Sequence, residues 1–146
     1  MCNMKKALIC GVSGQDGAYL ARFLLNNGYK VIGTSRDAQI NSFANLKKLD
    51  IFEKIQLESM ALNDFRNVLL MINKTEPDEI YNLAGQSSVG ISFEQPIETL
   101  ESITMGTLNL LEAIRFSRKE IKFYNAASSE CFGESRDGPA EESTSF

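Results

Sequence analysis

Residues 11–17, GVSGQDG, carry three glycines with two residues between each successive pair. An apolar run of strand length (7–12) leads into this stretch, and an amphipathic helical pattern (16–27) follows it. Glycine lets a backbone turn tightly, approach a pyrophosphate and pack a helix against a strand. A helix N-terminus adds free N–H groups and the positive end of the helix dipole. The stretch predicts a dinucleotide phosphate loop rather than a glycine-rich turn without a ligand, and its predicted cofactor-binding residues are Gly11, Gly14, Gln15, Asp16 and Gly17.

Strand and helix patterns alternate along the rest of the chain. Buried-strand and helix signals in alternation predict βαβ units, and therefore an α/β fold with a doubly wound parallel sheet, the Rossmann fold. We expect one such domain over 1–146, with ligands at the carboxyl ends of the strands beside strand one. The predicted strands are 7–12, 30–34, 54–60, 79–84 and 121–127. The predicted helices are 16–27, 42–49, 64–73 and a long helix from Pro96 with the stripe Leu100, Ile103, Thr107, Leu111 and Ile114.

Composition excludes several classes of function. The net charge is -4, with 15 Lys and Arg against 19 Asp and Glu and no basic cluster longer than two residues, so we expect no nucleic-acid partner. The apolar runs are too short to cross a bilayer, so no membrane association is expected. Three cysteines without CxxC spacing predict a reduced, cytoplasmic protein with no disulfide and no metal site. The absence of histidine excludes Ser-His-Asp and Cys-His mechanisms within this chain.

The end of the second predicted strand bears on the choice of dinucleotide. In this fold a carboxylate there hydrogen-bonds the ribose 2′-OH of NAD, whereas an arginine accommodates the 2′-phosphate of NADP. The chain has small hydroxyl residues at this point, followed by Arg36 and Asp37. The pattern favours NADP with Arg36 on the 2′-phosphate. The alternative is that Arg36 is a solvated charge neutralised by Asp37.

The third and fourth predicted strands end in turns that suit a nucleotide. The turn after strand three, around Ala61 and Leu62, is placed to contact the adenine side, and Asp64 there is interpreted as a helix N-cap. Small residues after strand four leave room for the cofactor's ribose and pyrophosphate. The predicted cofactor-binding residues are Leu83, Ala84 and Gly85. Three polar residues follow that either hydrogen-bond a sugar substrate or cap the turn: Gln86, Ser87 and Ser88.

Several blocks of the sequence together carry a family resemblance. The GxxGxxG spacing points toward the short-chain dehydrogenase/reductase superfamily. Longer blocks are more specific: GVSGQDGAYL, TSRD, PDEIYNLAGQSSVGISFEQP, GTLNLLEAIR and KFYNAASSECFG. With these blocks the chain resembles the amino-terminal part of the GDP-mannose 4,6-dehydratases, which are extended short-chain dehydrogenases/reductases. The resemblance implies tight NADP binding and conversion of GDP-mannose to GDP-4-keto-6-deoxymannose.

That resemblance also implies a mechanism and two catalytic residues. In the family a hydride passes from sugar C4 to the nicotinamide, a base removes the C5 proton, water leaves from C6 and the hydride returns to C6. The family's hydroxyl–x–Glu motif matches 128–130, so Ser128 is expected to bond the C4 oxygen and Glu130 to act as the C5 base and acid. Read from the residues alone, Glu130 is more readily interpreted as an ordinary surface acid near a loop.

The chain departs from the family in three respects. Ala61 stands where many relatives have an acid that contacts adenosine. Residues 36–43 correspond to a loop that in the family reaches a neighbouring subunit, which implies a homotetramer, although this loop differs from the commonest version. No Tyr-x-x-x-Lys pair occurs in the chain, so we expect it to be the front part of a longer enzyme and inactive alone. A non-catalytic dinucleotide-binding module and another nucleotide-sugar enzyme, such as an NAD-dependent epimerase, are the alternatives.

Overall fold

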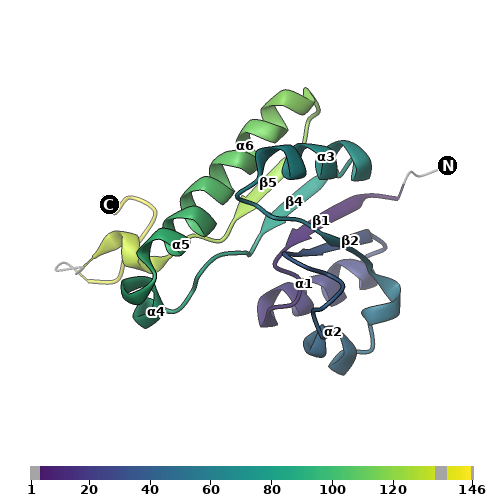
Figure 1. Ribbon diagram of the computed structural model, residues 1–146, viewed down its shortest axis with the longest axis horizontal. Coiled ribbons are helices and arrows are strands. Elements are labelled where there is room, and N and C mark those ends of the chain that lie inside the picture. Colours follow the sequence, from purple (N-terminus) through teal and green to yellow (C-terminus); the bar gives the residue numbers. More distant parts are fainter. Residues whose placement is uncertain (1–3, 134–137, 146) are drawn as a thin grey trace.

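A parallel sheet forms the centre of the molecule. The computed structural model describes residues 4–133 and 138–145, and within them the sheet has five strands in the order β3-β2-β1-β4-β5. The chain builds one side of the sheet outward from β1 and then returns to build the other side (Figure 1). This reversal beside β1 is the predicted Rossmann topology. The strands are β1 (Lys6–Cys10), β2 (Lys30–Ser35), β3 (Gln56–Ser59), β4 (Glu79–Asn82) and β5 (Lys122–Asn125).

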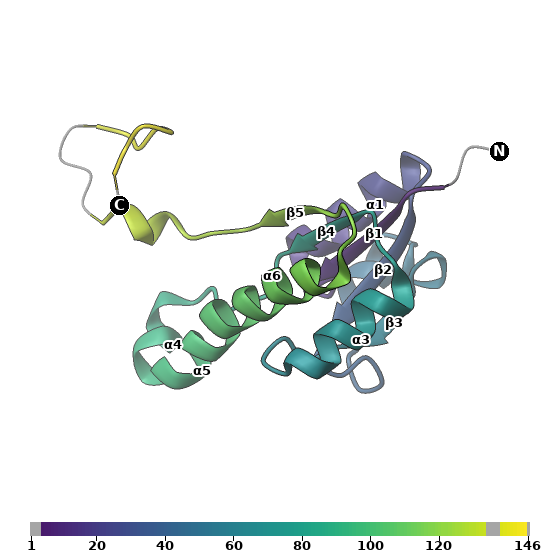
Figure 2. The ribbon, with the colours of Figure 1, turned by 90° about the horizontal axis from the view of Figure 1, so that it is seen from above.

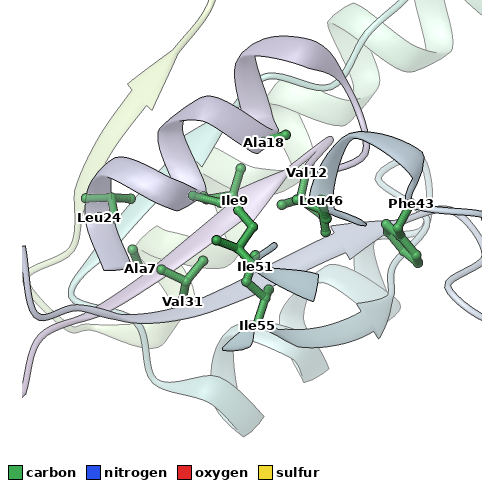
Figure 3. Packing of buried hydrophobic residues seen from close by; sticks show 11 residues of the cluster. Ala7, Ile9, Val12, Ala18, Leu24, Val31, Phe43, Leu46, Ile51 and Ile55 are labelled. Carbon is green, nitrogen blue, oxygen red and sulfur yellow. The ribbon is translucent and has the colours of Figure 1, made fainter. Parts of the chain in front are cut away.

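Helices cover both faces of the sheet. Helices α1 (Gln15–Asn26) and α2 (Ala44–Lys48) lie on one face, and α3 (Phe65–Thr75) and α6 (Gly106–Ser117) lie on the other (Figure 1). Successive residues of a strand point to opposite faces, so β1 supplies both cores. Ala7 and Ile9 pack into the cluster under α1, which Figure 3 shows, while the residues next to them in β1 pack under α3 and α6.

Two helix boundaries follow the signals in the sequence. At the end of α1, Gly28 takes a positive φ of 78°, and the side-chain amide of Asn27 donates to the Phe23 carbonyl at 2.8 Å. At the start of α3, Asp64 accepts a hydrogen bond from the backbone N–H of Asn67 at 3.2 Å. The N-cap interpretation of Asp64 is therefore confirmed.

The region after β4 differs most from the sequence prediction. It contains an unpredicted helix α4 (Val89–Glu94), then α5 (Pro96–Leu100) and a π-helical turn η2 (Glu101–Met105) that continues into α6. The predicted apolar stripe is largely exposed: Leu100 is 62% exposed and Leu111 47%. The fully or nearly buried positions are instead Gly106, Asn109, Leu110 and Ala113.

Local packing explains why this face of α6 is the buried one. A Cβ on Gly106 would lie 3.2 Å from the Leu62 Cβ, and the Asn109 amide donates to the Leu62 carbonyl at 2.8 Å. The helix therefore lies directly on the loop that follows β3, where only a small residue and an amide fit. The extra residue of the π-helical turn also rotates α5 relative to α6, so the two helices do not continue the same face.

Short 3-10 turns occur at η1 (Phe52–Lys54), before β3, and at η3 (Ser129–Phe132), after β5.

Beyond its carboxyl end, β5 continues into a segment that leads away from the sheet. Figure 2 shows the chain beyond β5 extending past the carboxyl end of the sheet, well clear of α3. Strand β5 pairs with β4 and forms one edge of the described sheet, where its alternate residues are exposed.

Candidate functional site

A cavity of about 620 Å³ opens at the carboxyl ends of β1, β2 and β4. Its volume lies in the range of small-molecule sites, and its position beside the reversal of strand order is where such sheets bind ligands. Residues predicted from sequence to bind the cofactor or the sugar form much of its wall, namely Gly11, Gly14, Arg36, Leu62, Leu83, Ala84, Gly85, Gln86 and Ser87.

The glycine loop has a shape that other residues would not allow. Gly11 has a φ of 83°, and a Cβ there would lie 3.0 Å from the backbone carbonyl of Leu83. A Cβ on Gly17 would lie 2.4 Å from the Gly11 oxygen. The N–H groups of Gly11 and Val12 both donate to the Thr34 carbonyl, at 3.1 and 3.3 Å. The loop is therefore pinned between β2 and β4 and leaves a side-chain-free cradle that fits a pyrophosphate.

Three predicted residues of the loop lie in the first turn of α1 and not in the cavity wall. Gln15, Asp16 and Gly17 begin the helix directly after Gly14. The first N–H groups of any α-helix have no acceptor inside the helix. Cofactor contact by these residues is therefore expected through the backbone, and it stays a prediction.

Arg36 lines the cavity together with two polar neighbours. The Asn41 amide donates to Ser35 Oγ at 3.1 Å, and all three residues border the cavity at the end of β2. The Asp37 carboxylate accepts the backbone N–H groups of Gln39 and Ile40, at 2.9 and 3.4 Å. Within the described residues no ion pair joins Arg36 to Asp37. The arginine thus faces the cavity without the neutralising partner that the alternative interpretation requires.

Two residues in the turn after β3, Ala61 and Leu62, were predicted to contact the cofactor, and only Leu62 borders the cavity. Leu62 and its neighbour Asn63 border the cavity. The Ala61 N–H donates to Asn67 Oδ1 at 3.0 Å, and the Ala61 carbonyl accepts from the Asp64 N–H at 3.2 Å. Both backbone groups of Ala61 are therefore engaged within the chain, and contact between Ala61 and a cofactor stays a prediction.

Of the three polar residues in the loop after β4 that were predicted to contact a sugar, two border the cavity. Gln86 and Ser87 face the cavity, and the Gln86 N–H donates to Ser102 Oγ at 3.4 Å. Ser88 lies outside the cavity wall and accepts the Ile91 N–H at 3.5 Å, as the N-cap of α4. This geometry favours the capping alternative for Ser88, whereas the first two residues remain candidates for sugar contacts.

The predicted catalytic pair follows β5 but does not border the cavity. Ser128 accepts the backbone N–H of Glu130 at 3.2 Å and so caps the η3 turn. Both side chains are exposed. Their strand is nevertheless tied to the cavity, because the Asn82 amide at the end of β4 donates to Asn125 Oδ1 at 2.8 Å. The catalytic roles of Ser128 and Glu130 stay predictions.

Other cavity residues were missed from sequence. Cys10 and Asn41 border the cavity, and burial raises the pKa of the Cys10 thiol to about 12, which keeps it protonated and unreactive. A helical wall is formed by Gln95, Glu98, Glu101 and Ser102. Polar residues three and four apart in a helix are a sequence signal for such a wall. The sequence prediction instead used the apolar stripe of the same segment, which lies on another face of the helix.

The described residues show neither a membrane-spanning helix nor a cluster of metal ligands. None of the helices within 4–133 and 138–145 has the length and apolar character needed to cross a bilayer. In the same residues no three acidic, cysteine or histidine side chains gather where a metal ion would be held. The described cysteines, Cys10 and Cys131, are free thiols.

The fold and the cavity define a Rossmann domain with a glycine-rich loop of the phosphate-binding kind. Comparisons with known proteins identify its family. The sequence profile of GDP-mannose 4,6 dehydratase matches residues 8–146. A GDP-mannose 4,6-dehydratase of Vibrio cholerae is 44% identical over 152 aligned residues, which cover 97% of this chain and 40% of that protein. The chain belongs to the GDP-mannose 4,6-dehydratase family, and it spans about 40% of the length of that relative.

Solved structures confirm the fold. The UDP-Glc/GlcNAc 4-epimerase of Campylobacter jejuni superposes with a TM-score of 0.84 at 21% identity, covering 97% of this chain and 42% of that one. The UDP-glucose 4-epimerase of Brucella ovis, solved in complex with NAD, gives a TM-score of 0.75 at 20% identity over 89% of this chain and 38% of that one. At these identities the likeness establishes the Rossmann-type fold.

Proposed function

We propose that this chain is the cofactor-binding part of an NADP-dependent enzyme that dehydrates GDP-mannose to GDP-4-keto-6-deoxymannose. The observation that carries the proposal is the family match along 8–146, which coincides with a cavity walled by the glycine loop and by Arg36. Because the chain spans about 40% of its relative, the activity is proposed for the whole protein.

The cavity fits NADP in shape and in charge. Its side-chain-free cradle at Gly11 suits the pyrophosphate, and the Arg36 guanidinium is a permanent cation that suits a 2′-phosphate. Asp37, just after β2, lies outside the cavity wall, and its Oδ1 accepts two backbone N–H groups. Among the described residues, therefore, no carboxylate borders the cavity at the end of β2, where one would bond the 2′-hydroxyl of NAD. When bound, NADP would supply the acceptor for the C4 hydride and return that hydride to C6.

The chain's own residues would transfer the sugar protons and hold the sugar in position. The sugar C5 proton becomes acidic only once C4 is a ketone, so its base must lie next to the oxidised carbon. Glu130 is proposed as that base and as the acid that helps to expel the C6 hydroxyl, with Ser128 bonding the C4 oxygen. The hydrogen bond between Asn82 and Asn125 supports this assignment, because it fixes the strand that leads to Glu130 beside the cavity loop.

Assembly and location are proposed along with the activity. A homotetramer is proposed from the resemblance of residues 36–43 to a subunit-bridging loop. A cytoplasmic location is proposed because the described cysteines, Cys10 and Cys131, are free thiols and Cys10 is buried.

One experiment tests the activity directly. The whole reading frame that contains this chain is expressed and incubated with GDP-mannose and NADP, and the products are separated by chromatography and followed by mass spectrometry and proton NMR. The expected result is a product lighter than GDP-mannose by one water, with no net consumption of NADP. Parallel incubation of residues 1–146 alone is expected to give none of this product. Conversion to a C4 epimer, with no loss of water, would replace the proposal with the epimerase alternative.

A further inference from the structure

The cavity has a second wall that the glycine loop does not explain. Four polar residues border the cavity from the N-cap of α5 to the first turn of η2, at positions one to three residues apart: Gln95, Glu98, Glu101 and Ser102. The turn η2 is π-helical, a distortion that is common at functional sites. Ser102 Oγ accepts the Gln86 N–H at 3.4 Å, which attaches this wall to the loop after β4.

Charge is distributed unevenly in the cavity. Among the described residues that border it, the charged ones are Arg36 at the end of β2 and the carboxylates Glu98 and Glu101 on the helical wall. No ion pair within the described chain neutralises either carboxylate. The cavity therefore has a cationic end and an anionic side.

The fold fixes which part of a dinucleotide meets each charge. In this fold a bound dinucleotide would place its pyrophosphate at the N-terminus of α1 and its adenosine ribose at the end of β2, where Arg36 stands. The other half of the molecule must then extend across β1 toward β4, on the side of the helical wall. That half carries the nicotinamide ring, which is a cation when oxidised and neutral when reduced. The carboxylates thus stand on the side of the one group whose charge changes in the reaction.

We propose that Glu98 and Glu101 make this cavity select the oxidised nicotinamide cofactor over the reduced one. The inference rests on the proposed function, because it takes the cavity to be a nicotinamide dinucleotide site. Two carboxylates in a partly solvated cavity are expected to favour the cationic ring by about threefold to tenfold. An internal hydride cycle begins and ends with oxidised cofactor, so this preference stabilises the form that is ready for substrate.

The test is a ratio of dissociation constants, which removes the phosphates from the comparison. NADP⁺ and NADPH carry the same phosphate groups, so any repulsion between these groups and the carboxylates cancels in the ratio of their Kd values. The ratio is measured by calorimetric titration of the chain and of Glu98→Gln, Glu101→Gln and the double variant. The substitutions are isosteric and lie at exposed positions, so the fold is preserved. Glu94→Gln, an exposed glutamate of α4 outside the cavity wall, is the matched control.

In the double variant we expect NADPH to bind more tightly relative to NADP⁺, by about threefold to tenfold, with a smaller shift at high salt and none in the control. An unchanged ratio, or an equal change for both cofactors, would overturn the proposal. A shift of the same size in Glu94→Gln would overturn it as well. The same titrations with NAD⁺ and NADH separate the two proposals: tight NAD binding rejects NADP as the cofactor while the ratio still tests the carboxylates. If the whole protein that contains this chain binds no dinucleotide in the same titrations, both proposals are rejected.

Discussion

The side-chain amide of Asn82 donates a hydrogen bond to Asn125 Oδ1 at 2.8 Å, and the two residues are direct partners in the β4–β5 ladder. Asn82 is 3% exposed, and its own Oδ1 accepts the Ala84 N–H at 3.3 Å. Thr107 of α6 completes the group with a contact of 3.4 Å to Asn125. The Asn82 side chain and its bonded neighbours thus connect the loop after β4, strand β5 before the proposed base, and helix α6.

Asn125→Ala is expected to lower the free energy of unfolding by about 1–3 kcal/mol. The substitution removes the shorter of two bonds from the buried Asn82 amide and leaves it only the contact of 3.5 Å to Thr107 Oγ1. A poorly satisfied buried donor costs about that much. Urea denaturation followed by circular dichroism measures the loss. Asn73→Ala, an exposed asparagine of α3, is the control and should change stability by less than about 0.5 kcal/mol. Equal losses in the two variants would mean that the Asn82–Asn125 bond contributes nothing specific.

Arg36→Ala is expected to weaken NADP⁺ binding by about tenfold or more while leaving NAD⁺ binding nearly unchanged. In the proposed assignment the guanidinium would form charge-assisted bonds with the 2′-phosphate, which NAD lacks. Titration of both cofactors against the chain measures the two constants. Arg66→Ala, an exposed arginine of α3 outside the cavity wall, controls for loss of a positive charge. If both cofactors weaken equally in Arg36→Ala, the residue does not read the 2′-phosphate.

Glu130→Gln in the whole protein is expected to halt the reaction after the first step. Oxidation at C4 needs no base at C5, so the variant should still reduce bound cofactor, but it cannot remove the C5 proton. We expect NADPH absorbance to accumulate, with a fall of about a hundredfold or more in product formation and in exchange of the C5 proton with deuterated solvent. Glu120→Gln, an exposed acid before β5, is the control. Normal proton exchange in Glu130→Gln would assign the base to another residue.

The sequence predicted the parts of the fold that depend on local pattern. Each strand and the helices α1, α2 and α3 follow from apolar spacing and from signals such as Asp64, which caps α3 as expected. The glycine loop and Arg36 were also found at the cavity, because their chemistry depends on their position directly after a strand.

The rest was not predictable because tertiary contacts decide it. The buried face of α6 is set by Leu62, on a loop more than forty residues away, which accepts from Asn109 and crowds Gly106. A hydrophobicity pattern reads the apolar stripe at Leu100 and Leu111 as the buried face, although both are exposed in this chain. The carboxylate wall at Glu98 and Glu101 was missed for the same reason, since it lies on the face that the pattern marks as solvent.

The exposed apolar residues of α4, α5 and α6 predict self-association of this chain. Leu108 and Leu111 are 48% and 47% exposed and lie three residues apart, on one face of α6. An exposed apolar patch of this kind and an unpaired strand edge both favour association. Sedimentation velocity over a range of concentrations should show species larger than a monomer, and Leu108→Glu with Leu111→Glu should reduce them. Leu70→Glu, at an exposed position of α3, should not. A monomer at the highest concentration would contradict the prediction.

The amino-terminal end of the sheet predicts a pH-dependent contribution to stability. The carboxylate of Glu79, at the start of β4, accepts the Tyr81 hydroxyl at 2.7 Å and the Tyr29 hydroxyl at 3.2 Å, and the Lys5 ammonium lies 3.5 Å away. The Tyr81 hydrogen bond, together with the bond from Tyr29 and the nearby Lys5, lowers the pKa of the Glu79 carboxyl against the opposing effect of burial. Burial and the bond to Glu79 raise the pKa of Tyr81 to about 12.

Tyr81→Phe is therefore expected to cost about 1–2 kcal/mol at neutral pH, and less at both extremes. A carboxyl with a lowered folded pKa stabilises fully above its unfolded value of 4.5, and this stabilisation is lost as the pH falls through the folded pKa. A tyrosine with a raised folded pKa stabilises below its unfolded value of 10.0, and this stabilisation is lost as the pH rises toward 12. Urea denaturation at a series of pH values should show the difference between wild type and variant shrinking below pH 4.5 and above pH 10. Tyr19→Phe, at an exposed position of α1, is the control and should change stability by less than about 0.5 kcal/mol. A Tyr81→Phe difference that is constant from acid to alkali would mean that the hydroxyl acts by packing alone and that its bond to Glu79 is not coupled to ionisation.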